Sequence, residues 1–215
     1  MPSCPTFCGR SSVKVAPVME WAEPISMRYR PGHRQQSRQR VLDAVSRGFR
    51  IAGYNGVGVD GLSKAAGITS GGFYGHFRSK AEAFRAAVVG GLRDLLAGVE
   101  SCRRQHGSSW VAAFADFYLS QKVTCEPGEA CALPSLSPEV ARADEESRLA
   151  YQEELLKLVK AIETGLPTAG SEKQRRQAAW ALLAQLAGGV MMARAVADKT
   201  VAAEIAAAVR KHIDA

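Results

Sequence analysis

No apolar run in the sequence is long enough to form an uninterrupted membrane span. The most apolar stretch, residues 182–197, is broken by Gln185 and Arg194, whereas a spanning helix needs about 20 predominantly apolar residues. A signal peptide is also missing, because the start of the chain lacks a compact apolar segment followed by a small-residue cleavage site. These absences favour a soluble, cytoplasmic protein with no membrane partner.

Cysteine is scarce and irregularly spaced. The five cysteines are Cys4, Cys8, Cys102, Cys125 and Cys131, no CxxC pair occurs, and the four histidines are scattered. Structural zinc sites and disulfide frameworks both show closely spaced or regularly patterned ligands. The sequence therefore predicts no metal site and no cofactor, and its thiols are expected to be reduced.

The sequence also lacks a constellation of residues typical of an enzyme. Serine and histidine do not form a recognisable nucleophile motif, and no glycine-rich phosphate loop follows a strand. No catalytic residue is therefore predicted. A small helical hydrolase is a rival interpretation, against which the absence of catalytic groups argues.

Strand patterns are missing as well, and helical periodicity takes their place. Val41, Leu42, Val45, Phe49 and Ala52 share one helical face. The segment from Cys125 to Pro138 is rich in proline and is expected to be a loop with at most one helical turn. The fold class is all-α, with about nine helices. Helices are predicted near residues 37–53, 59–66, 70–77, 79–104, 108–123, 138–164, 171–195 and 199–213.

The positive charge is concentrated in one short part of the chain. The net charge is +7, and residues 27–80 hold ten Lys or Arg against two Asp or Glu, whereas residues 81–215 hold sixteen against seventeen. A compact basic segment indicates a polyanionic partner such as double-stranded DNA. Simple solubility is the alternative, but it does not require the charge to be localised.

Residues 59–77 have the pattern of a helix-turn-helix. Gly67 separates two short helices, Thr69 is a good N-cap for the second, and Phe73 and Phe77 are spaced to face the core. Ser79 and Glu82 then form a capping box for a long helix. In such motifs the second helix, here residues 70–77, enters the major groove of DNA.

The stretch GVGVDGLSKAAGITSGGFYGHFRSKAEAF resembles the DNA-binding domain of the TetR family of transcriptional regulators. The resemblance covers about residues 37–85. It implies a three-helix DNA-binding domain over residues 36–80 and a helical domain over 81–215 that binds an effector and dimerises. Residues 1–35, which lack helical periodicity at their start, are expected to be disordered or a flexible basic arm. The matching elements are Phe49 and Gly53, the Leu62…Ala65-Ala66-Gly67-Ile68 core, and Phe73-Tyr74-x-His76-Phe77-x-x-Lys80.

The resemblance also implies which residues contact DNA. Tyr74 and His76 match positions that bind phosphates, and Lys80 matches one that clamps the DNA backbone. Thr69 and Ser70 match positions that touch phosphates or base edges, and Val59 and Asp60 lie where relatives contact DNA. Asp60 fits poorly, because a carboxylate repels phosphate; it could accept from a cytosine amine or cap its helix. Gly71, Gly72 and Gly75 allow close approach of the helix but leave base readout poor.

A basic arm precedes the motif. It carries Arg28, Arg30, Arg34, Arg38 and Arg40, and Pro31-Gly32 is expected to interrupt any helix. Such an arm can enter the minor groove, or it can be a solvated tail. Translation could start at Met1 or at Met27.

The protein is expected to be a repressor, and its effector a small hydrophobic or aromatic molecule that releases it from a palindromic operator. Alternatives left open are a thiol-based sensor of electrophiles or oxidants acting through Cys102, Cys125 and Cys131, an activator in place of a repressor, and an architectural protein that coats DNA without sequence preference. Candidate pocket residues are Phe84, Val88, Leu92, Trp110, Phe114, Phe117, Tyr118, Leu133, Tyr151 and Trp180, although such a stripe is also typical of plain core.

A homodimer through the last two helices is predicted from their small residues. Ala178, Ala181, Ala184 and Gly188 recur at helical spacing, and Ala202 and Ala206 follow in the last helix, which allows close helix packing. Two helices from each protomer would form a four-helix interface, as the resemblance implies. A two-fold dimer would place its recognition helices roughly 34–36 Å apart, to match a near-palindromic operator.

Overall fold

The structure, a computed structural model, describes residues 31–166 and 170–213, and these contain helices and no strand. The all-α prediction is confirmed. Short 3₁₀ turns at Gly107–Ser109 (η1) and Pro127–Glu129 (η2) join some of the helices. The α-helices are α1 (Pro31–Gly56), α2 (Val59–Ala65), α3 (Ser70–His76), α4 (Lys80–His106), α5 (Trp110–Thr124), α6 (Ala132–Val140), α7 (Glu145–Gly165), α8 (Glu172–Ala195) and α9 (Lys199–Ile213).

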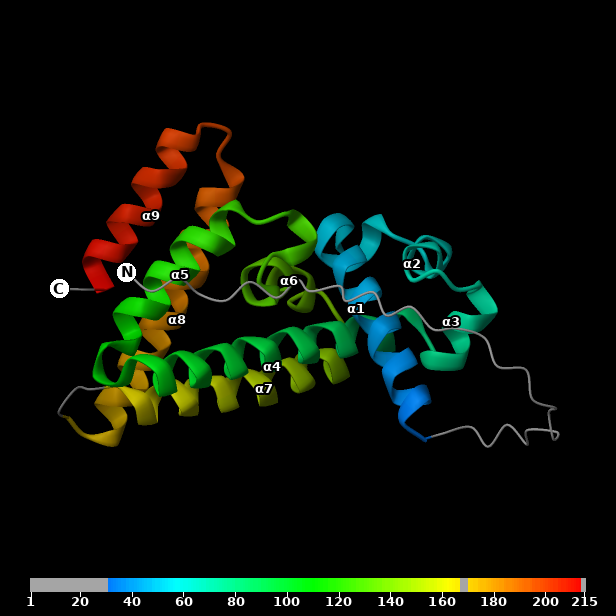
Figure 1. The fold of residues 1–215 in the computed structure, drawn as a ribbon, viewed down its shortest axis with the longest axis horizontal. Coiled ribbons are helices and arrows are strands. Elements are labelled where there is room, and N and C mark those ends of the chain that lie inside the picture. Colours follow the sequence, from blue (N-terminus) through cyan, green and yellow to red (C-terminus); the bar gives the residue numbers. More distant parts are fainter. Residues whose placement is uncertain (1–30, 167–169, 214–215) are drawn as a thin grey trace, which may run out of the picture.

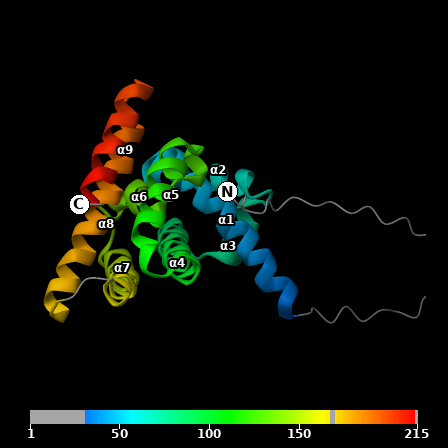
Figure 2. The same cartoon turned by 60° about the vertical axis from the view of Figure 1, so that its left-hand side comes forward.

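The helices divide the molecule into two ends, which α4 connects. Helices α1, α2 and α3 gather at one end, and α4 runs from them alongside α7 (Figure 1). Helices α8 and α9 lie side by side at the far side of the molecule (Figure 2). The helix-turn-helix and the helices proposed for dimerisation are therefore well separated.

Local signals in the sequence correctly mark several helix ends. The Thr69 hydroxyl accepts a hydrogen bond from the Gly72 amide at 3.0 Å, and Ser79 does the same for Glu82. The carboxylate of Glu82 accepts from the Arg78 amide, one residue earlier than in a standard capping box. Gly53 has φ 73° and kinks α1, which continues to Gly56.

The first helix differs from its prediction at both ends. It begins at Pro31, not near Ser37, because proline fits the first turn of a helix, where its missing N–H would be unpaired anyway. Pro31 and Gly32 therefore begin a helix, and the prediction that they interrupt any helix was wrong. Residues 1–30, with Arg28 and Arg30, lie outside the described residues. Ala52, predicted to face inward, is exposed.

The proline-rich segment was predicted to be a loop, and this was wrong. Residues Ala132–Val140 form α6 with Pro134 and Pro138 inside it. Pro134 lies in the first turn, where its missing N–H costs no helical hydrogen bond, and α6 ends two residues after Pro138. The predicted helix over 138–164 instead begins at Glu145, where the Asp144 carboxylate accepts from the Ser147 amide at 2.7 Å.

One continuous apolar core joins the two ends. The predicted inner face of α4 is confirmed, since Phe84, Val88, Leu92, Leu95 and Val99 are all buried. Among the described helices, α8 alone is long and apolar enough to cross a membrane by length and composition. Its buried Leu183, Leu186 and Val190 belong to this core.

Candidate DNA-binding surface and ligand cavities

The helix-turn-helix is built around three fully buried side chains. Leu62 of α2 and Phe73 of α3 have 0% exposure and Phe77 has 1%, and the rings of Phe73 and Phe77 lie 5.3 Å apart. Gly67, with φ 67°, makes the left-handed turn between the helices, a backbone conformation that suits glycine. This small core fixes the face that α3 turns outward.

The outward face of α3 carries most of the predicted DNA contacts. Thr69, Gly71 and Gly75 are exposed, and 58% of the Tyr74 side chain is accessible. Lys80 follows at the first position of α4, half-buried. The structure therefore brings these residues to one surface, as expected for a helix that enters a groove. Ser70, Gly72 and His76 are also half-buried and belong to the same helix.

Asp60 has a structural partner that the sequence did not reveal. Its carboxylate accepts a hydrogen bond from the Ser70 hydroxyl at 2.6 Å, and it lies in the first turn of α2, where a negative charge is favourable. Because the Ser70 hydrogen points to Asp60, the Ser70 oxygen presents lone pairs outward. Val59 is half-buried against the core, so less of it is available to DNA.

Among the described residues, no neighbour requires glycine at two positions of α3. A Cβ at Gly75 would meet no atom within 4 Å, and one at Gly71 would make only an ordinary contact with Thr69 Oγ1 at 3.8 Å. Glycine inside a helix costs about 1 kcal/mol relative to alanine. These glycines are therefore explained better by close approach of a ligand surface than by packing.

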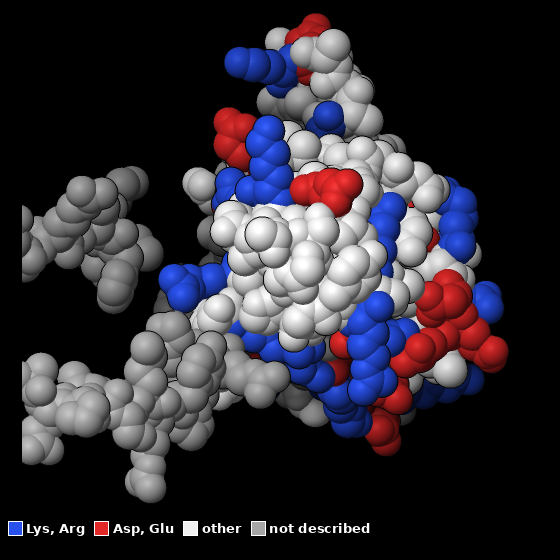
Figure 3. All heavy atoms as spheres, turned by 90° about the vertical axis from the view of Figure 1, so that its right-hand side faces the viewer, with Lys and Arg blue, Asp and Glu red and all other residues white. Residues whose placement is uncertain are grey.

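Two cations beside the motif are held by aromatic rings. Lys80 Nζ lies 4.4 Å from the centroid of Tyr54, and the Arg38 guanidinium lies 5.4 Å from that of Phe77. Arg38 also pairs with Glu82 at 3.9 Å. Arg38 and Arg40, interpreted from the sequence as part of an arm, belong to α1. In Figure 3, Lys and Arg side chains border an uncharged central area at this end of the molecule, with several Asp and Glu side chains among them.

Comparison with known proteins agrees with this geometry. Residues 41–87 match the family described as bacterial regulatory proteins, tetR family. The HTH-type transcriptional regulator LmrA of Bacillus subtilis (strain 168) is 24% identical over 170 residues, which are 76% of this chain and 89% of LmrA. The DNA-binding domain of the chain is therefore that of the TetR family of transcriptional regulators. TetR-family regulators bind DNA and small-molecule effectors and act as dimers.

Solved structures share the fold of this chain. The reduced form of Escherichia coli NemR superposes with a TM-score of 0.70 at 19% identity, over 83% of this chain and 95% of NemR. A TetR-family regulator from Agrobacterium tumefaciens gives the same TM-score and identity, over 84% and 97% of the two chains. The helical arrangement beyond the DNA-binding domain is thus also that of the family.

The ten candidate pocket residues do not lie together. Leu133, Tyr151 and Trp180 line an apolar cavity of about 300 Å³ between α6, α7 and α8, and the Tyr151 hydroxyl is 2.8 Å from that of Ser137. The other candidates are dispersed: Phe114, Phe117 and Tyr118 line a second cavity, Phe84 a small one between the two ends and Trp110 another, while Val88 and Leu92 are core residues.

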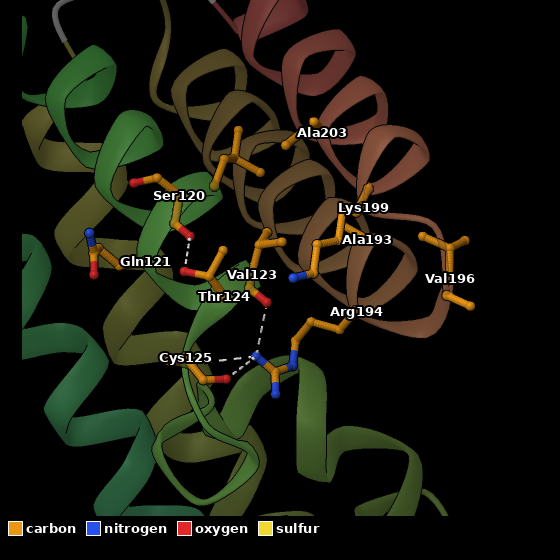
Figure 4. A pocket seen from close by; sticks show the side chains of 14 residues that line it. Ser120, Gln121, Val123, Thr124, Cys125, Ala193, Arg194, Val196, Lys199 and Ala203 are labelled. Carbon is orange, nitrogen blue, oxygen red and sulfur yellow. Dashed lines mark hydrogen bonds between the residues drawn. The ribbon is translucent and has the colours of Figure 1, made fainter.

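A cavity of about 720 Å³ lies between the ends of α5 and α8 and the start of α9 (Figure 4). Arg194 reaches across it and donates to the carbonyl oxygens of Lys122, Val123 and Cys125 at 2.8–3.2 Å. A guanidinium here satisfies carbonyls that the end of α5 leaves without helical partners. This cavity is walled by the helices proposed for dimerisation.

The three described cysteines have different surroundings. They are free thiols, and burial raises the pKa of Cys102 and of Cys131 above the ordinary thiol value. Both are therefore poor sources of thiolate. Cys125 lies in the large cavity, with its Sγ 3.5 Å from the Arg194 guanidinium.

Proposed function

We propose that this TetR-family regulator is a repressor that binds a near-palindromic operator as a homodimer, and that a small apolar molecule releases it. The observation that carries the DNA contacts is the outward face of α3. Tyr74, Gly71 and Gly75 are exposed there, while Phe73 and Phe77 anchor the opposite face. Thr69, Tyr74, His76 and Lys80 would hold phosphates, with Ser70 at the base edges.

The effector would occupy the apolar cavity between α6, α7 and α8. Leu133, Leu155 and Leu183 supply apolar walls, and the Ser137–Tyr151 hydroxyl pair supplies one polar group. A pocket of this composition suits a largely apolar ligand with one hydrogen-bonding group. For release, the ligand must bind more tightly to a conformation that does not bind DNA.

Dimerisation is supported by an apolar surface on α8. Trp180, Met191 and Met192 are 37–51% exposed, and the small residues Ala181 and Ala184 lie between them on exposed positions. Trp180, Ala184 and Met191 also line the apolar cavity, so the dimer interface would border the effector site. Gly189, by contrast, allows α8 to pack closely on α9 within one chain, since a Cβ there would come within 3.1 Å of Val209. The exposed apolar and small side chains of α8 are available to pack against a second copy of the chain.

The test combines operator selection with effector release. The full chain is used to select DNA from a random pool, and the selected sequence is footprinted; one short near-palindrome should be protected. Protection without sequence preference would indicate an architectural protein instead. Apolar compounds are then screened for release of the fluorescent operator.

Filling the cavity tests the effector site. Leu155→Trp should keep operator affinity and reduce the response to the releasing compound about tenfold or more, because the indole occupies cavity volume. Leu149→Trp is the matched control, since Leu149 is 53% exposed on the same helix. An unchanged response in Leu155→Trp contradicts the assignment of the cavity.

A thiol-based sensor is the second candidate function, and Cys125 is the described cysteine that fits it best. Cys125 lines the cavity between α5, α8 and α9, whereas burial disfavours a thiolate at Cys102 and Cys131. Operator release by a quinone should then be lost in Cys125→Ser and retained in Cys102→Ser. Release in both variants argues against this candidate.

A further inference from the structure

A second cavity lies where the two ends of the molecule meet. Its volume is about 290 Å³, and its walls come from α1, α4, α5 and the segment between η2 and α6. Arg50 enters it from the DNA-binding end, which is formed by α1, α2 and α3. The effector end, formed by the remaining helices, contributes Leu95, Phe114, Tyr118 and Cys131. It is distinct from the apolar cavity, which none of these residues lines.

Two cations in this cavity have no carboxylate partner among the described residues. Arg50 Nη1 donates to the Gly128 carbonyl oxygen at 3.3 Å, while Arg50 Nε is buried without a hydrogen-bond partner. Lys122 Nζ donates to the backbone carbonyl oxygen of Glu129 at 3.3 Å. The Nε edge of the Arg50 guanidinium is therefore free to form the paired hydrogen bonds that a carboxylate accepts.

The acidic residues of the cavity do not neutralise these cations. The Glu129 carboxylate pairs with Arg47, and Asp94 is exposed. The cavity also holds a donor that has only a weak partner: Tyr118 is 2% exposed, and its hydroxyl lies against the Cys131 thiol without a nitrogen or oxygen partner among the described residues. A buried hydroxyl that meets only a thiol could gain free energy from a stronger acceptor supplied by a ligand.

The Tyr118 hydroxyl is suited to donate a hydrogen bond, because the phenol stays uncharged. Burial is the main cause that raises the pKa of its phenol well above the ordinary value, so it remains protonated at neutral pH. The neighbouring Cys131 thiol also stays protonated, because burial raises its pKa. A thiol is a weak hydrogen-bonding group. The strong donors of the cavity are Arg50, Lys122 and Tyr118, whereas its two carboxylates, Asp94 and Glu129, are exposed to solvent.

We infer that this cavity binds the carboxylate of a small organic acid, held by Arg50, Lys122 and Tyr118, with the apolar body of the acid against Phe114 and Leu95. The inference goes beyond the proposed effector site, because it assigns a different ligand class to a different cavity. Its consequence for DNA rests on the proposed function. Arg50 follows Phe49, which is buried in the core beneath the helix-turn-helix, so a bound acid would tie α1 to α5.

Benzoate is the probe, with benzamide as its uncharged analogue of nearly equal shape. Binding to the full-length protein without DNA is measured by isothermal titration and ligand-observed NMR. Benzoate should bind at least about tenfold more tightly than benzamide. Arg50→Gln should weaken benzoate binding roughly tenfold or more, and Tyr118→Phe, which keeps the ring and its packing, about threefold to tenfold.

Two controls locate the probe. Arg40→Gln removes an exposed cation from the same helix and should leave benzoate affinity unchanged. Leu155→Trp alters only the apolar cavity and should also leave it unchanged. Equal affinity for benzamide, full benzoate affinity in both Arg50→Gln and Tyr118→Phe, or loss of binding in Leu155→Trp would each overturn the inference. Since DNA is absent, failure of operator binding would refute the proposed function without affecting this result.

Discussion

The DNA-binding end uses two helices of seven residues each, α2 and α3, whereas the effector end packs helices of 21–27 residues, such as α4, α7 and α8, along their lengths. The short helices are held by few side chains: Thr69 caps α3, and Leu62, Phe73 and Phe77 form their small core. In the long helices stability is distributed over many buried residues and several ion pairs. Truncation of one buried side chain should therefore destabilise only the neighbouring short helices at the DNA-binding end. At the effector end it should destabilise several long helices together.

Phe73 offers the largest test of this difference. Its ring is fully buried between Phe77 and the rest of the small core, and Phe73→Ala should cost about 3–5 kcal/mol. Hydrogen exchange is expected to show loss of protection in α2 and α3, with α7 and α8 still protected, and operator binding should be lost.

Leu158→Ala is the counterpart in the effector end, since Leu158 is also fully buried. It should weaken protection across α4, α7 and α8 together. If Phe73→Ala instead lowers protection evenly through both ends, the two regions unfold as one unit and the contrast between them is wrong.

Glu154 tests the ion pairs of the effector end. Its carboxylate, 4% exposed, accepts from Arg93 at 2.8 Å and from Lys157 at 2.9 Å, and the Arg93 hydrogen bond is the main cause that lowers the pKa of Glu154. Glu154→Gln should lower the free energy of unfolding at pH 7 by about 1–2 kcal/mol, a value reduced because Arg93 is largely exposed.

The pH dependence of this effect has a definite sign. A lowered pKa in the folded state stabilises the protein above the pKa of an unfolded glutamate, about 4.3, and this contribution disappears as the pH falls through the folded value. Urea unfolding of the wild type and of Glu154→Gln should therefore converge as the pH falls below the lowered pKa of Glu154. Glu153→Gln, an exposed neighbour, should match the wild type throughout; a difference that persists in acid would exclude the ion pair as its cause.

The same contrast explains what could be predicted from the sequence. Thr69, Gly67 and the Phe73–Phe77 spacing act over three or four residues, so caps, turn and buried face of the helix-turn-helix were read correctly. The Asp60–Ser70 hydrogen bond joins two helices and has no local signal. In the effector end, Pro134 and Pro138 suggested a loop, but long-range packing holds α6 as a helix.

Cavities were the least predictable feature, because they depend on which long helices meet. Phe114 and Tyr118 share a cavity with Arg50, 64 and 68 residues earlier in the chain, and a periodic apolar stripe carries no information about that meeting. The candidate pocket residues were thus correct in their apolar character but were distributed by the fold over several sites and the core.

The smallest expected effect concerns the glycines of α3, and it separates folding from recognition. Since a Cβ at Gly75 would meet no neighbouring atom within 4 Å, Gly75→Ala should stabilise the free protein by about 0.5–1 kcal/mol. On DNA the added methyl group would block close approach of α3, and operator affinity should fall roughly tenfold, about 1.4 kcal/mol. Gly90→Ala is the matched control, because Gly90 also has open space around it in α4; it should give the same gain in thermal unfolding without a change in operator affinity. If Gly75→Ala is more stable and binds the operator as tightly as the wild type, α3 does not approach DNA through this glycine, and the open positions of the recognition helix need another explanation.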